Sequence, residues 1–188
     1  MKLELLILLF LLPILTFSQV TTTPSIPTAT DEITIIFDAT GTGLEGYTGD
    51  VYAHTGVTVN GAKWQNVIGD WGNNSTQPQL TRDSSNPNLY TLLIAPDIFT
   101  YYEVATSATI TELSFVFRAS DGSQQTNPDL FITIYEAGLN ITFTNPTNLS
   151  AYNLNDIITI TAESSVSADL ELLVNNISQQ TATNTTTI

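Results

Sequence analysis

Hydrophobic and polar residues alternate in several short stretches of the chain, whereas no long stretch repeats with the period of a helix. Alternation with a period of two indicates a β-strand that buries one of its faces. Turn-forming residues such as Asp121-Gly122 separate these stretches. The pattern predicts two strands joined by an Asn60-Gly61 loop within residues 49–72, and one helical turn over residues 97–102. Further strands are predicted over residues 31–38, 79–82, 89–94, 112–118 and 130–135.

Strands of this length, separated by turns, predict an all-β fold of the immunoglobulin-like β-sandwich type. We place this sandwich at residues 31–137, after a Thr- and Pro-rich extended lead-in at residues 19–30. New alternation begins after residue 138, and it predicts the first strands of a second, incomplete β-sandwich in residues 138–188. A half sandwich leaves an unpaired edge and an uncovered apolar face, so we expect the sequence to be the front end of a longer protein.

Residues 1–18 resemble a secretory signal peptide. They have a short charged start, a Leu-rich run and small residues near Ser18. We expect cleavage between Ser18 and Gln19 and a secreted or cell-surface protein that is not inserted in a membrane afterwards. The alternative is a membrane anchor, although the apolar run is short for a span and Pro13 interrupts it.

Charge and composition narrow the classes of partner. The chain has 18 acidic and 4 basic residues, for a formal net charge of −14. Such a chain should bind neither nucleic acid nor an anionic membrane, and it suits a neutral ligand. The absence of cysteine excludes disulfides and thiolate sites, and a single histidine excludes a multi-histidine metal site within one chain. We expect no cofactor and no metal.

The sequence offers no catalytic centre. Glycosidic cleavage needs two carboxyl groups on either side of the bond, and the acidic residues here show no pairing. A Ser/His/Asp triad would require His54, which no nucleophile-elbow motif accompanies. We therefore predict no catalytic residues in this chain.

Residues 49–72 hold the histidine and both tryptophans of the chain. Small apolar Val51 and Ala53 suit the core, so their neighbours on the strand should point outward. Val67 is the expected inward residue of the next strand, which turns Trp64 outward unless a bulge near Ile68 reverses it. Exposed rings beside amide groups suit sugar binding, because pyranose rings stack on aromatic faces and amides bond hydroxyls. The predicted ligand-binding residues are Tyr52, His54, Trp64, Gln65, Asn66 and Trp71.

The alternative is that both tryptophans belong to the core, as a tryptophan often does in a small β-sandwich. The chain would then be a structural Ig-like spacer without a ligand of its own. A complete small enzyme is a further alternative, which the lack of a catalytic motif disfavours.

Several sequence blocks together resemble a known module. It is the N-terminal starch-binding-type sandwich of secreted α-amylase-family glycoside hydrolases from Bacteroidetes, which is related to glucan-binding domains of outer-membrane starch-utilisation proteins. The blocks lie at residues 31–38, 46–56, 64–72, 89–92 and 113–122, for example Gly-Asp-Val-Tyr-Ala-His-Thr-Gly at residues 49–56.

The resemblance implies stacking aromatics at Tyr52, His54 and Trp64. It implies a non-catalytic module that holds α-glucan, as polysaccharide or oligosaccharide, near a downstream catalytic domain of the same chain. Lipoprotein relatives carry an anchoring cysteine that this chain lacks, which favours the secreted-enzyme branch.

Overall fold

The computed structural model describes residues 19–146 and 152–188, so the expected signal peptide lies outside the described residues. In the described parts of the chain, the regular secondary structure is almost entirely β-strand, as the sequence predicts. The strands are β1 (Val20–Thr23), β2 (Ile33–Asp38), β3 (Val51–Val59), β4 (Ala62–Gln65), β5 (Thr81–Arg82), β6 (Leu89–Ile94), β7 (Ile110–Ala119), β8 (Leu130–Thr133), β9 (Ile141–Asn145), β10 (Thr161–Val174) and β11 (Ile177–Thr187).

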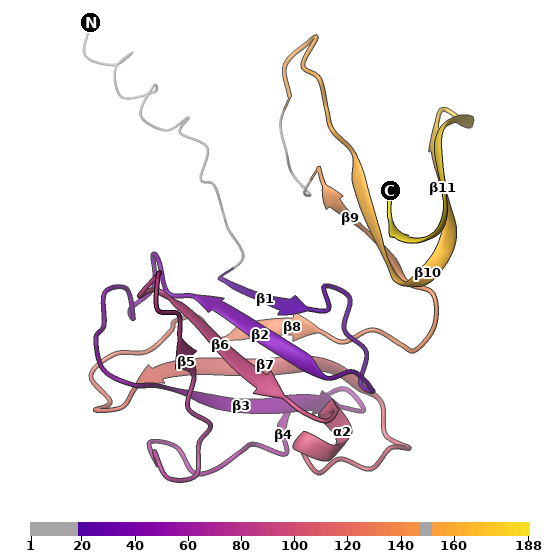
Figure 1. Ribbon diagram of the computed structural model, residues 1–188. Coiled ribbons are helices and arrows are strands. Elements are labelled where there is room, and N and C mark those ends of the chain that lie inside the picture. The colour runs from indigo at the N-terminus through magenta and orange to yellow at the C-terminus, as the bar shows by residue number, and fades with distance from the viewer. Residues whose placement is uncertain (1–18, 147–151) are drawn as a thin grey trace, which may run out of the picture.

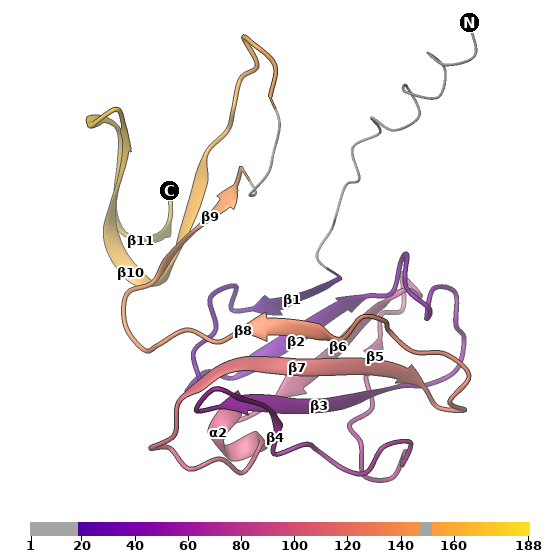
Figure 2. The same ribbon diagram turned by 180° about the vertical axis from the view of Figure 1, so that it is seen from behind.

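Two four-stranded antiparallel sheets face each other and form a β-sandwich (Figures 1 and 2). One sheet has the strand order β1-β2-β6-β5 and the other has the order β4-β3-β7-β8. This is the arrangement of an immunoglobulin-type sandwich, in which strands A, B, E and D form one sheet and strands C, F and G form the other. Here β1, β2, β6 and β5 correspond to the first set and β3, β7 and β8 to the second, with β4 as an additional strand beside β3. The fold class predicted from alternation is therefore confirmed.

The core of the sandwich lies between these sheets and is built largely from the inward residues of the predicted strands. Leu113, Phe115 and Phe117 of β7 are fully buried, as the alternation predicts. The Phe117 ring packs on Phe37 of the facing sheet, with ring centroids 4.3 Å apart. Side chains of this size supply most of the hydrophobic free energy of such a core.

A single helical turn, α2 (Ile98–Tyr101), follows β6, close to the predicted position. The Asp97 carboxylate caps it by accepting a hydrogen bond from the backbone N–H of Thr100 at 2.7 Å. Within the described residues, no helix has the length and apolar character needed to cross a membrane.

The N-terminal lead-in belongs to the sandwich. Residues 20–23 form β1, which pairs along its length with β2 from Val20↔Phe37 to Thr23↔Thr34. The first sheet therefore begins before residue 31. The Thr-rich segment lacks an apolar alternation because an edge strand of this length needs little beyond its backbone hydrogen bonds.

Strands β9, β10 and β11 form a separate three-stranded antiparallel sheet. The alternation of Ile and Thr over residues 156–162 predicts a strand there, and the Thr-rich residues 181–188 predict none. Both predictions were wrong. Residues 156–160 lie outside the strands and β10 begins only at Thr161, while the Thr-rich tail forms part of β11. A hairpin turn at Asn175 and Asn176, both with positive φ (51° and 62°), joins β10 to β11. Many apolar side chains of this region are exposed, including Ile141 and Phe143.

Candidate functional site

The outward face of β3 carries the first two predicted site residues. Val51 and Ala53 are buried in the core, which confirms the predicted alternation. Tyr52 and His54 are half-buried. They lie on the outer face of the sheet β4-β3-β7-β8, on the side away from the core.

The β3–β4 hairpin brings Trp64 over this outer face. Its turn uses Asn60 and Gly61, with φ values of 49° and 83°, which suits a type I′ hairpin. Trp64 itself has φ of 55°. This left-handed conformation interrupts the regular alternation of β4.

Gly56 makes room for the indole. It lies on the outer face, and a Cβ built there would be 3.5 Å from the Trp64 ring and only 2.9 Å from the carbonyl oxygen of Gln65. The expectation that Val67 points inward was wrong. Its methyl group also lies 3.0 Å from the Gly56 Cβ position, and Ile68 is the residue that packs against the core. The positive φ values of Trp64 and Asn66 (55° and 49°) account for this shift.

His54, Trp64 and Trp71 form an aromatic cluster on the outer face. The rings of His54 and Trp64 are stacked, with centroids 5.3 Å apart and an interplanar angle of 25°. Trp71 meets the imidazole edge-on, with centroids 4.9 Å apart at 83°. Neither tryptophan is part of the hydrophobic core, and Trp71 is 54% exposed. The structure thus joins three of the six predicted residues, with Trp71 as the most accessible ring.

A buried arginine adjoins the cluster. Arg118 of β7 is paired with Tyr52 of β3 and is only 2% exposed. Its guanidinium lies over the Tyr52 ring, 5.3 Å from the ring centroid. It donates to the side-chain oxygens of Gln77 at 2.6 Å and Asn74 at 2.7 Å, and to the backbone carbonyl of Ala119 at 3.0 Å. These bonds tie the segment between β4 and β5 to the outer face of the sheet.

The surroundings of His54 disfavour protonation of its ring. Burial, reinforced by the positive charge of Arg118, lowers its pKa below the ordinary value, and Asp129 opposes this effect. Because the ring is harder to protonate in the folded chain, the unfolded chain binds more protons at acidic pH, and acid therefore favours unfolding. The contribution of His54 to stability is therefore complete above pH of about 6.5 and declines as the pH falls below that value.

A hollow of about 190 Å³ lies beside Trp71. Polar groups dominate its lining, because the turn after β7 supplies amides, a hydroxyl and a carboxylate. The lining residues are Trp71, Gly72, Arg118, Ser120, Asp121, Gly122, Gln124 and Gln125. An exposed indole can stack on an apolar ring face, and the neighbouring amides of Gln124 and Gln125 can form hydrogen bonds with hydroxyl groups.

Two predicted residues lie outside this arrangement. Gln65 and Asn66 are exposed at the end of β4. The Gln65 amide donates to the Lys63 carbonyl oxygen at 2.9 Å, and the Asn66 amide donates to the Glu103 carbonyl oxygen at 3.3 Å. Both amides are thus engaged with backbone rather than with the aromatic cluster.

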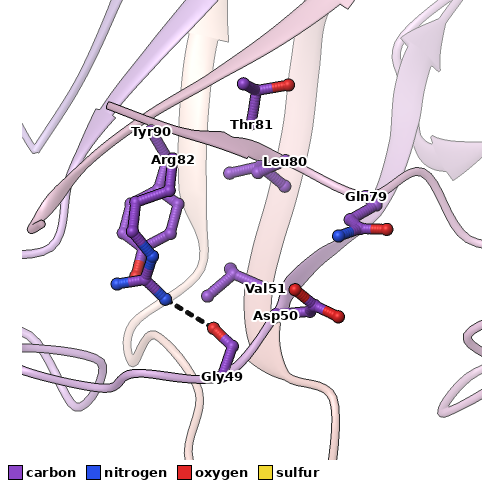
Figure 3. A pocket seen from close by; sticks show the side chains of 8 residues that line it. All are labelled: Gly49, Asp50, Val51, Gln79, Leu80, Thr81, Arg82 and Tyr90. Carbon is purple, nitrogen blue, oxygen red and sulfur yellow. Dashed lines mark hydrogen bonds between the residues drawn. The ribbon is translucent and has the colours of Figure 1, made fainter. Parts of the chain in front are cut away.

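A larger hollow, of about 450 Å³, lies where β3 begins, between Arg82 and Gln79 (Figure 3). The guanidinium of Arg82 is already engaged with backbone. Arg82 donates to the backbone carbonyls of Tyr47 at 2.7 Å and Pro87 at 2.8 Å, and to that of Gly49. This arginine therefore ties loops together, and Asp50 is the other charged residue that lines the hollow.

Sequence reasoning missed Gln77, Asn74 and Arg118 as members of the site. The alternation of β7 places Arg118 outward, which was a usable signal. Nothing in the sequence indicates that it lies opposite Tyr52, 66 residues earlier in the chain, because that depends on the register between β3 and β7. The contacts of Gln77 and Asn74 arise in an irregular segment, where periodicity gives no information.

Comparisons with known proteins supply no family: no protein-family model and no curated protein matches the chain. In residues 19–146 and 152–188, no group of three or more His, Cys, Asp or Glu side chains is placed to hold a metal ion.

Proposed function

We propose that this chain is a non-catalytic α-glucan-binding module, and that the outer face of the sheet β4-β3-β7-β8 holds the sugar. The single observation that carries the proposal is the position of Trp71, an exposed indole braced edge-on by His54 beside a polar hollow. The net charge of −14 favours a neutral ligand. The resemblance to starch-binding-type sandwiches supports α-glucan as the sugar.

The biological setting is part of the same proposal. A module of this kind, joined to the catalytic domain of a secreted α-amylase-like glycoside hydrolase, would raise the local concentration of polysaccharide at that domain even with weak contacts. The ligand-free spacer is the competing function, and the following experiment separates the two.

Trp71→Ala is expected to weaken α-glucan binding by about 1–3 kcal/mol, by analogy with the stacking of other rings on aromatic side chains. Because Trp71 is more than half exposed, the melting temperature of the variant should stay close to that of the unmodified chain. Retardation in amylose-containing gels and calorimetry with maltooligosaccharides measure the binding, and a thermal melt measures the stability.

Leu93→Ala is the matched control. Leu93 is 53% exposed, similar to Trp71, but lies on β6 in the other sheet. The Leu93→Ala variant should bind glucan as tightly as the unmodified chain does. If the unmodified chain binds no α-glucan, or if both variants bind equally weakly, the glucan-binding proposal is wrong and the spacer function is favoured.

Export gives a further expected outcome. If residues 1–18 are a signal peptide, the secreted protein begins at Gln19, because small residues precede that position. N-terminal sequencing or intact mass of secreted material measures this. A mature protein that retains the Leu-rich run would contradict export by cleavage.

A further inference from the structure

A chain of hydrogen bonds runs from β7 to the aromatic cluster. It begins at Arg118, continues through the side-chain amide of Gln77, and ends at Nδ1 of His54. Both donor residues are shielded from water, with Arg118 2% and Gln77 4% exposed. Buried polar groups of this kind adopt the arrangement in which every bond has one donor and one acceptor.

The guanidinium fixes the direction of the chain. An arginine side chain only donates hydrogen bonds, so the Gln77 atom that lies 2.6 Å from Arg118 Nε is the carbonyl oxygen. The opposite orientation of the amide would set two donors against each other. Arg118 therefore determines which way the Gln77 amide points.

The amide in turn fixes the proton of the imidazole. With its oxygen toward Arg118, Gln77 presents its NH2 group to His54 Nδ1 at 3.0 Å. An amide nitrogen only donates, so Nδ1 must be the unprotonated acceptor, and the proton of the neutral ring resides on Nε2.

Nε2 is the free end of this chain. No hydrogen bond joins it to any residue in the described ranges, and it is absent from the buried, unpartnered atoms there. It therefore remains open to solvent. Trp64 covers one face of the ring and Trp71 approaches edge-on. A turn of the ring that exchanged its two nitrogens would break the bond to Gln77 and disturb both ring contacts.

We propose that Gln77 and Arg118 are positioning residues that hold His54 as the Nε2–H tautomer, so that the cluster offers a ligand a fixed hydrogen-bond donor between two indoles. The partner group that suits this donor is an uncharged oxygen acceptor, such as a hydroxyl or ring oxygen of a sugar. The identity of the ligand rests on the proposed function, whereas the tautomer does not.

The surroundings of the ring agree with a neutral imidazole. Arg118 from β7 and Asp129, just before β8, are the charged groups that act on His54. From β4 and the following segment, Trp64 and Trp71 contact the ring, and neither of them titrates. Protonation at Nδ1 would place an N–H group against the NH2 group of Gln77, which opposes it in the same direction as burial does.

The test is nitrogen NMR of the uniformly 15N-labelled full chain, where one histidine gives one imidazole spectrum. Above the pKa of His54, long-range 1H–15N correlations should show a protonated Nε2 and an unprotonated Nδ1. The reverse pattern, or shifts averaged between two tautomers, would overturn the proposal.

Gln77→Glu gives the second arm. A carboxylate accepts from both neighbours, so Nδ1 should become protonated and the pKa of His54 should rise relative to the unmodified chain. Gln79→Glu is the control, because it adds the same charge two residues away, at an exposed side chain that contacts Tyr52. Its neutral His54 should keep the Nε2–H tautomer. Identical tautomers in the unmodified chain and in Gln77→Glu would mean that Gln77 does not set the proton.

Addition of maltoheptaose separates the two proposals. A shift of the Nε2–H resonance on binding would support both the donor and the ligand. The expected tautomer without any response to α-glucan would leave the positioning role intact and count against the proposed function. Glucan binding by a chain whose His54 carries its proton on Nδ1 would support the proposed function and contradict the positioning role of Gln77 and Arg118.

Discussion

Phe117→Ala is expected to lower the free energy of unfolding of the sandwich by about 3–5 kcal/mol, the usual cost of removing a large aromatic side chain from a core. Phe117 is fully buried. Its ring packs on Phe37 across the two sheets and on Phe115 along its own strand, with centroids 4.3 and 5.4 Å away. The alanine would leave a cavity between sheets that are each held in register by their own hydrogen bonds.

Urea unfolding followed by far-ultraviolet circular dichroism measures this loss. Phe131→Ala in the same sheet is the control, because Phe131 is 39% exposed and contacts the Lys63 ammonium rather than the core. It should cost about 1 kcal/mol or less. Equal losses in the two variants would contradict a core centred on Phe117.

Gly56→Val is expected to lower the free energy of unfolding by about 1–3 kcal/mol, the usual penalty for overpacking. Its Cβ would lie 2.9 Å from the Gln65 carbonyl oxygen and 3.0 Å from a Val67 methyl group, so the β3–β4 hairpin would have to move. Trp64 would move with it and separate from His54. Chemical unfolding measures the stability, and near-ultraviolet circular dichroism detects the change around the indole.

Ser114→Ala is the control for Gly56→Val. Ser114 lies opposite Gly56 on β7, and its buried hydroxyl oxygen has no hydrogen-bond partner within the described residues. Removing that hydroxyl should cost no stability. An unchanged spectrum and an unchanged unfolding curve for Gly56→Val would contradict the close packing of the hairpin against β3.

The sandwich was predictable where strands bury one face and expose the other. β2 and β6 bury large apolar side chains at every second position, so the alternation in the sequence directly reflects their environment. In β7 the alternating apolar residues also mark the core face, although Ser114, Val116 and Arg118 on the other face are buried too. β1 and β11 gave no such signal. The first is a polar strand at a sheet edge, and the second is a Thr-rich strand whose side chains are mostly exposed.

The candidate site was predictable only along single strands. The alternation of residues along β3 correctly predicted that Tyr52 and His54 point away from the core. The pairing of Tyr52 with Arg118 and the positive φ of Trp64 depend on strand register and tertiary packing. The reach of Gln77 to His54 depends on how an irregular segment crosses the sheet. Local pattern contains none of this information.

The aromatic cluster also gives the protein a built-in spectroscopic reporter. The two tryptophans of the chain, Trp64 and Trp71, both contact its single histidine. Indole emission therefore originates from one face of one sheet, while the core around Phe37 and Phe117 emits nothing in that range. Intrinsic fluorescence will report opening of the segment between β4 and β5, and a difference between its transition and that of circular dichroism will separate this local opening from global unfolding.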